Sequence, residues 1–383
     1  MQRELPEGWN KFKLGELTRI RTGKLDVNAQ DINGKYPFFT CSQKVYSIDF
    51  YDYDCECVLV AGNGDLNVKY YNGKFNAYQR TYIIESLDQR ILDVKYLYYF
   101  LNKYISILRN KSIGGVIKYI KLGYLKDIKI PIPKLEIQKK IVYILEKSED
   151  TKRLRAQADE LTQQLLQSLF LEMFGDPANN PNGFDQVKLG DIGDVSSGLT
   201  LNGQRRNNKQ NLYPYLRVAN VFRNKFNLSE IKYIHVSNSE LDRFLLKKND
   251  VLIVEGHGNI EEIGRSAVWN GQISNCVHQN HIIKVRLNEK YISPFFVSYF
   301  LNMYGNNGYF SSKSRTTSGL NTISTNKVKN TKVCLPPIGL QKKFERIVVN
   351  MKQIQDIQKP SKQHIENLFN SLVQKAFKGE LIK

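Results

Sequence analysis

The chain has 383 residues and a mass of 44.4 kDa, enough for two or three domains, and its 41% hydrophobic and 24% charged residues are typical of a folded globular protein. The 56 Lys and Arg residues outnumber the 37 Asp and Glu residues, and the resulting net charge of +19 favours a polyanionic partner. There is no apolar run of membrane-spanning length and no signal-peptide core, so we expect a cytoplasmic protein with no membrane partner. Five scattered cysteines predict neither a disulfide framework nor a zinc site.

Residues 1–134 predict a mixed α/β domain. Short runs of β-branched residues at 58–60 and 82–84 indicate buried strands, and Asn72-Gly73 is a hairpin-turn signal. Apolar residues at helical spacing predict a helix over 94–107. Residues 135–175 then predict one long helix, since they contain no proline, no glycine before the last position, and apolar residues three and four apart. Residues 176–183, rich in Asn and Pro, predict a linker.

The second half of the sequence repeats the first. Residues 184–337 predict a second mixed α/β domain, with strands at 251–254 and 282–285, a helix from 294 to 303 and a hairpin signal at Asn270-Gly271. Residues 338–383 predict a second long helix, kinked near Pro360 because proline removes a backbone donor. In the sequence match, Cys57–Gly64 aligns with Val251–Gly258, and Tyr78-Gln79 aligns with His278-Gln279. The growing offset places insertions between about 200 and 248.

The predicted fold class is α+β, with two similar mixed α/β domains separated by two long, antiparallel coiled-coil helices. A helix of about 40 residues is roughly 60 Å long and cannot bury its apolar seam alone, so we expect the two helices to pair. The connectivity of the chain favours antiparallel pairing. Two related domains, a helical spacer and a strong positive charge together predict binding to two half-sites of double-stranded DNA.

Several motifs resemble those of one known family. Leu5-Pro-Glu-Gly-Trp9, Ile130-Pro-Ile-Pro133, Gln138-Lys-Lys140 and Met173-Phe-Gly-Asp-Pro177 occur in order, and their elements recur in the second half. In this respect the chain is similar to the specificity (S) subunit of a type I restriction-modification system. The resemblance implies two target-recognition domains that each read one half of a split DNA site, and helices that set the spacing and bind two methyltransferase (M) subunits. It also implies that restriction/translocase (R) subunits join the full complex.

We expect this chain to be a non-catalytic subunit. The sequence has no phosphate-binding loop, amino-methyltransferase motif or convincing nuclease core, and His278-x-x-His281 lies in a predicted strand region where a metal site is not favoured. No cofactor is expected in this chain, and the resemblance assigns S-adenosylmethionine, ATP and Mg to the partner subunits. Three alternatives stay open: the specificity subunit of a fused type II-like system, a nuclease with unrecognised motifs, and a coiled-coil scaffold with protein-binding domains.

Three predicted loops in each domain concentrate residues that can contact DNA. They are the Gly-x-Gly turn, the Tyr-Gln or His-Gln turn, and the loop before the last strand. Such Arg, Lys, Asn, Gln and His side chains read base edges or hold phosphates. The candidate DNA-binding residues are Asn63, Gln79, Arg80, Lys111, Lys118, His257, Asn259, His278, Gln279, Lys313, Arg315, Thr317 and Asn321.

Overall fold

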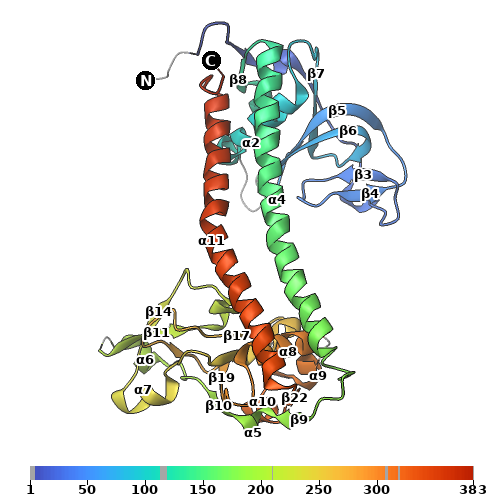
Figure 1. Ribbon diagram of the computed structural model, residues 1–383. Helices are drawn as coiled ribbons and strands as arrows, with labels where there is room; N and C mark the ends of the chain where they lie inside the picture. Colours follow the sequence, from blue (N-terminus) through green and yellow to red (C-terminus); the bar gives the residue numbers. More distant parts are fainter. Residues whose placement is uncertain (1–4, 113–118, 209, 307–308, 318–319, 383) are drawn as a thin grey trace. The chain divides into compact units, whose positions relative to one another are not determined.

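The computed structural model describes residues 5–112, 119–208, 210–306, 309–317 and 320–382. The chain forms two compact units. Unit 1 contains residues 1–156 and 359–383, and unit 2 contains residues 157–358. Each unit therefore holds one α/β domain together with parts of both long helices, as the colours of Figure 1 show.

Unit 1 is built on a six-stranded sheet. Its strands, in spatial order, are β2 (Thr18–Thr22), β7 (Thr81–Ser86), β5 (Tyr53–Ala61), β6 (Val68–Ala77), β3 (Tyr36–Phe39) and β4 (Tyr46–Ile48). Neighbouring strands are antiparallel except for the parallel pair β3 and β6. Helix α2 (Val94–Lys111) contacts β5 and β6 and begins at Asp93, whose carboxylate accepts a hydrogen bond from the amide of Tyr96. A short ladder, β1 (Asn10–Lys13) with β8 (Lys129–Ile132), completes the domain.

Side chains alternate across β5, so the strand contributes to two apolar clusters. Val58 and Val60 belong to the cluster that includes the buried residues of α2, whereas Cys57 and Leu59 pack with Phe39, Phe75 and other residues of the opposite face. All four β5 residues are buried. The continuous apolar run that the sequence shows at 58–60 is therefore a strand covered on both faces.

Unit 2 repeats this core and adds elements to it. Its strands are β10 (Gly193–Ser197), β19 (Ile282–Leu287), β15 (Val251–Val254) and β17 (Ser266–Val268) in one sheet, and β14 (Lys232–His235), β11 (Leu212–Leu216) and β18 (Val277–His278) in another. Helix α8 (Pro294–Asn306) contacts β15 and β17. The additional elements lie between 200 and 248, where the sequence predicts insertions, and they include α6 (Gly203–Asn207), β12 (Val221–Phe222), β13 (Lys225–Phe226) and α7 (Asn238–Phe244).

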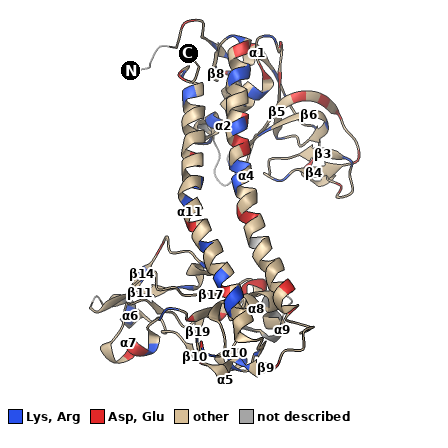
Figure 2. Ribbon diagram, viewed as in Figure 1, with Lys and Arg blue, Asp and Glu red and all other residues tan. Residues whose placement is uncertain are grey.

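The two predicted long helices are present. Helix α4 spans Leu135–Phe174 and helix α11 spans Ile338–Ala376, and each begins in one unit and ends in the other. Helix assignment continues through Pro360, so this proline does not divide α11, and the kink stays a prediction. The helix ends at Ala376, earlier than the predicted boundary at 383, and a turn follows it at 377–379. Both charge signs occur along α4 and α11 (Figure 2).

Within unit 1, α4 and α11 pack in antiparallel directions. Lys152 lies 3.1 Å from the carboxylate of Glu366 and stands over the ring of Phe369, whereas Ile382 shares a pocket with Lys139 and nearby residues of α4. In unit 2, Phe170 and Phe174 of α4 pack edge-on against Phe344 of α11. Several predicted seam residues are nonetheless exposed, namely Leu154, Leu161, Leu165, Ile354 and Leu368. A coiled coil along the whole length of the helices therefore stays a prediction.

A buried glutamine fixes each long helix to its domain. Gln138 donates hydrogen bonds to the carbonyls of Ile91 (2.7 Å) and Pro133 (2.9 Å) and accepts one from the amide of Asp93 (2.9 Å). In unit 2, Gln341 likewise bonds Pro336, Tyr291 and the amide of Ser293. Neither glutamine is exposed. The repeated Gln-Lys-Lys motif thus marks the joint between the first turn of a long helix and the start of α2 or α8.

A glycine and a proline meet after each long helix. Gly175 has a φ of +77°, and a Cβ there would lie 2.4 Å from Cγ of Pro181. Gly379 has a φ of +72°, and a Cβ there would lie 2.4 Å from Cγ of Pro6. Both positions require glycine because of the left-handed backbone and the close approach.

The two hairpin signals are wrong. Asn72 and Gly73 lie within β6, where they pair with Glu56 and Cys55 of β5. Asn270-Gly271 follows β17, which pairs with β15 and not with the next strand. No helix in the described part of the chain is both long and apolar enough to cross a membrane.

Candidate nucleic-acid interface

The first two predicted loops of unit 1 meet at Gly62, together with the residues that directly follow the third. The amide of Gly62 donates to the carbonyl of Arg80 (2.8 Å), and its carbonyl accepts from the amide of Ile120 (2.8 Å). Asn63 forms a bridge with Tyr119. A Cβ on Gly62 would lie 2.4 Å from the oxygen of Arg80, so only glycine fits this backbone geometry. The end of β5 therefore brings Arg80 of the second loop close to Tyr119 and Ile120, which follow the third.

The same arrangement occurs in unit 2 around Glu255. Its amide donates to the carbonyl of His281 (2.9 Å), and its carbonyl accepts from the amide of Ile323 (2.9 Å). Strand β16 (Gly256–His257) then pairs with β21 (Leu320–Thr322), which forms a hairpin with β20 (Arg315–Thr317). The two units thus use one backbone hydrogen-bond pattern to hold three loops.

This pattern corrects the sequence match at β5 and β15 by one residue. Val58 and Val60 share a cluster with α2, and Val251 and Ile253 share a cluster with α8. The matching faces and ladders make Val58 equivalent to Val251, so Gly62 corresponds to Glu255 and not to Gly256. A one-residue shift would move every side chain of the strand to the other face of the sheet.

The sequence match between residues 77–80 and 278–281, in the second loop, also shifts by one residue. The amide of Gln79 donates to Leu25, and that of Asn280 donates to Leu199. The bridges that pair Leu25 with Tyr78 and Leu199 with Gln279 agree with this equivalence. Arg80 therefore corresponds to His281, and Ala77 corresponds to His278.

Two predicted DNA-binding residues are buried. His278 is completely buried and Gln279 is 8% exposed, so neither side chain is available to DNA in this structure. Nδ1 of His278 lies 3.0 Å from the carbonyl oxygen of Ile282 and must carry the proton that it donates. Burial, with the nearby charge of Lys284, lowers the pKa of His278 to about 3. His278 is therefore a neutral core residue.

This burial predicts a pH-dependent stability of unit 2. Below the ordinary histidine pKa of about 6.5, the unfolded chain binds a proton at His278 that the folded chain excludes, so stability is lost as the pH falls below 6.5. The free energy of unfolding should fall by about 1.4 kcal/mol between pH 7.5 and 5.5 from this residue. His278→Gln should lack that decrease. Urea titrations of a Trp9→Phe background, followed by Trp269 fluorescence, measure it, and equal decreases in both proteins would contradict the assignment.

Other candidates lie on accessible surface. Gln79 and Arg80 are exposed, and the Arg80 guanidinium has no hydrogen bond or ion pair with any residue that the structure describes. Asn63 and His257 are half-buried, and Asn259 is exposed. The Asn259 side chain accepts from the amide of Glu261, which caps a short turn and ties up one of its oxygen's lone pairs.

The third loop is described in part. The Asn321 side chain is half-buried and donates to the carbonyl of Gly258 at 3.2 Å, which connects this loop to the first. Lys118 lies outside the described residues. For four further candidates the structure describes the backbone and not the side chain, namely Lys111, Lys313, Arg315 and Thr317.

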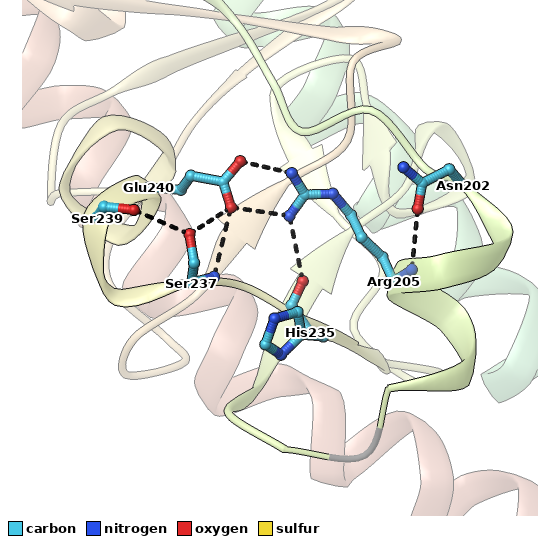
Figure 3. Close-up of polar contacts among 6 residues, drawn as sticks. All are labelled: Asn202, Arg205, His235, Ser237, Ser239 and Glu240. Carbon is cyan, nitrogen blue, oxygen red and sulfur yellow. Dashed lines mark hydrogen bonds and ion pairs between the residues drawn. The ribbon is translucent and has the colours of Figure 1, made fainter.

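An ion pair that sequence analysis missed holds the added elements of unit 2 (Figure 3). Arg205 of α6 makes two hydrogen bonds with the carboxylate of Glu240 on α7, and it also donates to the carbonyl of His235. The Ser237 hydroxyl donates to the same carboxylate. The Arg205 and Ser237 bonds lower the pKa of Glu240 to about 2. Ser237 and Glu240 have capping-box spacing, which is the one sequence signal for this cluster.

A separate basic groove of about 650 Å³ lies in unit 1. Four lysines line it, and none of its lining residues is acidic: Lys11, Lys103, Lys129 and Lys378. Phe100 and Phe377 form part of its apolar surface. Burial and the neighbouring charge of Lys378 lower the pKa of Lys103.

Two lysines of the groove are not kept at the equivalent positions of unit 2. In the strand pairs that precede the two long helices, Gln186 of unit 2 takes the place of Lys11 of unit 1. In α8, Met303 takes the place that Lys103 has in α2. Lys332 keeps the position of Lys129. Because the duplicated framework of unit 2 folds without a lysine at the positions of Lys11 and Lys103, these two lysines are not needed for the fold. Within the described residues, no group of three or more His, Cys, Asp or Glu is arranged to hold a metal ion.

Comparison with known proteins agrees with the duplicated site. The family model "Type I restriction modification DNA specificity domain" matches residues 6–163 and 181–367. The EcoDI type I restriction enzyme specificity subunit of Escherichia coli is 38% identical over 170 residues, which cover 43% of this chain and 38% of the relative. The EcoKI specificity subunit of E. coli K12 is 26% identical over 298 residues, covering 72% and 63%. The matches thus span less than two thirds of either relative.

Solved structures share the fold. The S subunit of a type I restriction-modification system from M. genitalium has a TM-score of 0.60 at 18% identity, covering 98% of each chain. A chain from a study of type I restriction-modification complex assembly has a TM-score of 0.59, covering 99% of this chain and 100% of that one. The two matched segments, which account for most of the sequence, establish that this chain belongs to the type I restriction-modification DNA specificity domain family.

Proposed function

We propose that the chain is the DNA-binding specificity subunit of a type I restriction-modification complex and is not itself catalytic. Each α/β domain reads one half of a split DNA target. The observation that carries the proposal is the shared hydrogen-bond frame of the two units, on which equivalent loops present different side chains. Gly62 and Arg80 in unit 1 correspond to Glu255 and His281 in unit 2. Two domains that share one backbone frame but present different side chains suit the recognition of two different half-sites.

We further propose that α4 and α11 space the two readers and bind two methyltransferase subunits, with restriction subunits joining the full complex. The exposed leucines of α4 support this partner assignment, since Leu154, Leu161 and Leu165 are each more than half exposed. A helical partner would bury them and gain roughly 1.5–3 kcal/mol for each fully covered side chain. S-adenosylmethionine, ATP and Mg belong to the partner subunits in this proposal.

Methylation mapping tests the function directly. The purified chain, with S-adenosylmethionine and no partner, should leave DNA unmethylated, and with Mg it should leave DNA uncut. Adding the methyltransferase subunit of its system should produce methylation at one split sequence. Methyl transfer or cleavage by the chain alone would refute a non-catalytic role, and cleavage by the two-subunit complex would favour a fused type II-like system.

The basic groove of unit 1 should add affinity without sequence preference. Lysines are point charges that contact phosphates, so Lys103→Gln and Lys129→Gln should weaken binding to all DNA sequences alike. Each lost contact should reduce the slope of log affinity against log salt by about 0.9. Fluorescence anisotropy at several salt concentrations measures both effects. Lys332→Gln is the matched control from unit 2, and no difference from it would show that the groove does not contact DNA.

A further inference from the structure

Equivalent positions of the two α/β domains carry side chains of opposite hydrogen-bonding character. In unit 1 this position holds Gly62, which has no side chain, beside the exposed guanidinium of Arg80. In unit 2 it holds Glu255 beside His281. The backbone bonds are the same, so the difference lies in the side chains alone.

Glu255 and His281 form a connected pair. Nδ1 of His281 lies 3.2 Å from Oε2 of Glu255, and the two side chains are 39% and 21% exposed. The ring also borders β16, since a Cβ on Gly256 would lie 3.3 Å from Nδ1. The pair therefore sits where all three loops of unit 2 meet and remains open to solvent.

The chemistry of this pair follows from the position of its proton. A carboxylate accepts hydrogen bonds, so an imidazole in its neutral form donates from Nδ1 and keeps a lone pair on Nε2. Both groups then offer acceptors to the outside. In the major groove, cytosine N4 and adenine N6 are the amino groups that donate hydrogen bonds. Arg80 has the reverse character, because a free guanidinium donates two parallel hydrogen bonds that match O6 and N7 of guanine.

We propose that Glu255 and His281 select a base with an exocyclic amino group in the half-site of unit 2, whereas Arg80 selects guanine at the corresponding position of unit 1. This inference rests on the proposed function and names its specificity-determining residues. It also explains why the duplicated frame carries a glycine in one copy and a glutamate in the other.

Selection from a randomised duplex library tests the proposal, using the full chain in complex with its methyltransferase subunit. Glu255→Gln keeps the side-chain volume but replaces one acceptor oxygen with a donor. It should reduce the preference for cytosine or adenine at one position of one half-site by about 10- to 100-fold. The other half-site and the remaining positions of the same half-site should be selected as before, and the latter show within the same experiment that unit 2 of the variant is folded. Glu261→Gln, an exposed neighbour, is the matched control.

Two further variants test the proposed role of Arg80 in unit 1. Arg80→Ala should remove a guanine preference from the half-site that Glu255→Gln leaves unchanged. Arg90→Ala is its control, because Arg90 bonds Asp88 at an exposed turn. The double variant Glu255→Gly with His281→Arg copies the unit 1 arrangement and should select guanine where the wild type selects an amino base.

The outcomes separate the inference from the function on which it rests. If the wild-type complex enriches no split sequence, the proposed function is wrong. If it enriches two half-sites and Glu255→Gln selects the same bases as Glu261→Gln, the function stands and the inference is overturned. The loss of a guanine or thymine preference in Glu255→Gln would overturn it as well.

Discussion

Replacing Gln138 with Ala should destabilise unit 1 by about 3–5 kcal/mol, because it removes three hydrogen bonds of a fully buried side chain and leaves a cavity. The amide of Asp93 and the carbonyls of Ile91 and Pro133 would lose their partner in this buried and part-buried joint. The first turn of α4 would also lose its attachment to the start of α2. Urea unfolding followed by Trp9 fluorescence, in a Trp269→Phe background, reports on unit 1.

The duplication supplies a matched comparison for this prediction. Gln341→Ala should have a similar effect on unit 2, followed through Trp269 in a Trp9→Phe background. Gln164→Ala on the exposed face of α4 should change stability by less than about 0.5 kcal/mol, since its side chain bonds Glu160 and no other residue that the structure describes. A cost below about 1 kcal/mol for Gln138→Ala would show that the buried joint does not hold the domain to its helix.

Lengthening both long helices by one heptad should move the two half-sites apart by up to three base pairs. Two covalent connections join the units, and both are helical where they cross the boundary, at 156/157 in α4 and at 358/359 in α11. Seven residues add about 10 Å to a helix, and a base pair occupies about 3.4 Å of duplex. Affinity for the original site should fall about 100-fold, with the half-site sequences unchanged.

Methylation mapping of the wild type and the lengthened variant in the same host measures the gap. Heptads keep apolar positions in phase, whereas a two-residue insertion in each helix rotates them by about 200° and should abolish activity. An active heptad variant with the original gap would show that the helices do not set the spacing. The partner subunits would then position the two domains.

The sequence predicts the regular elements well and the pairing of the two copies less well. The strands at 58–60 and 251–254, helices α2 and α8, and the limits of α4 follow from runs and spacings of apolar residues. Those signals are local, and burial of one face enforces them. Asn72-Gly73 has the same kind of local signal but lies within a strand, because pairing with β5 outweighs the turn preference.

The error at the candidate site has a physical origin. Matching letters aligned Gln79 with Gln279 and placed His278 among the DNA-binding residues, but a match of letters does not record which face a residue occupies. The ladders settle it: Ala77 and His278 are both fully buried, and Arg80 and His281 both carry the carbonyl that bonds the end of the central strand. The alternation of polar and apolar residues does not distinguish the two possible registers of these strands either, because Val58, Val60, Val251, Ile253 and the residues between them are all apolar.

The paired Gly–Pro contacts imply that the two ends of the chain meet in the same way as the two segments that residues 176–180 connect. Gly175 meets Pro181 across a continuous stretch of backbone, whereas Gly379 meets Pro6 across the two ends of the sequence. The second contact thus joins two chain segments that no peptide bond connects, in the same way that the first joins two segments of one continuous stretch. A circularly permuted chain, cut between 176 and 182 and joined from 382 to 5 by a short linker, would keep every contact described for either unit. The order of the two α/β domains in the sequence is therefore separable from the structure of each domain.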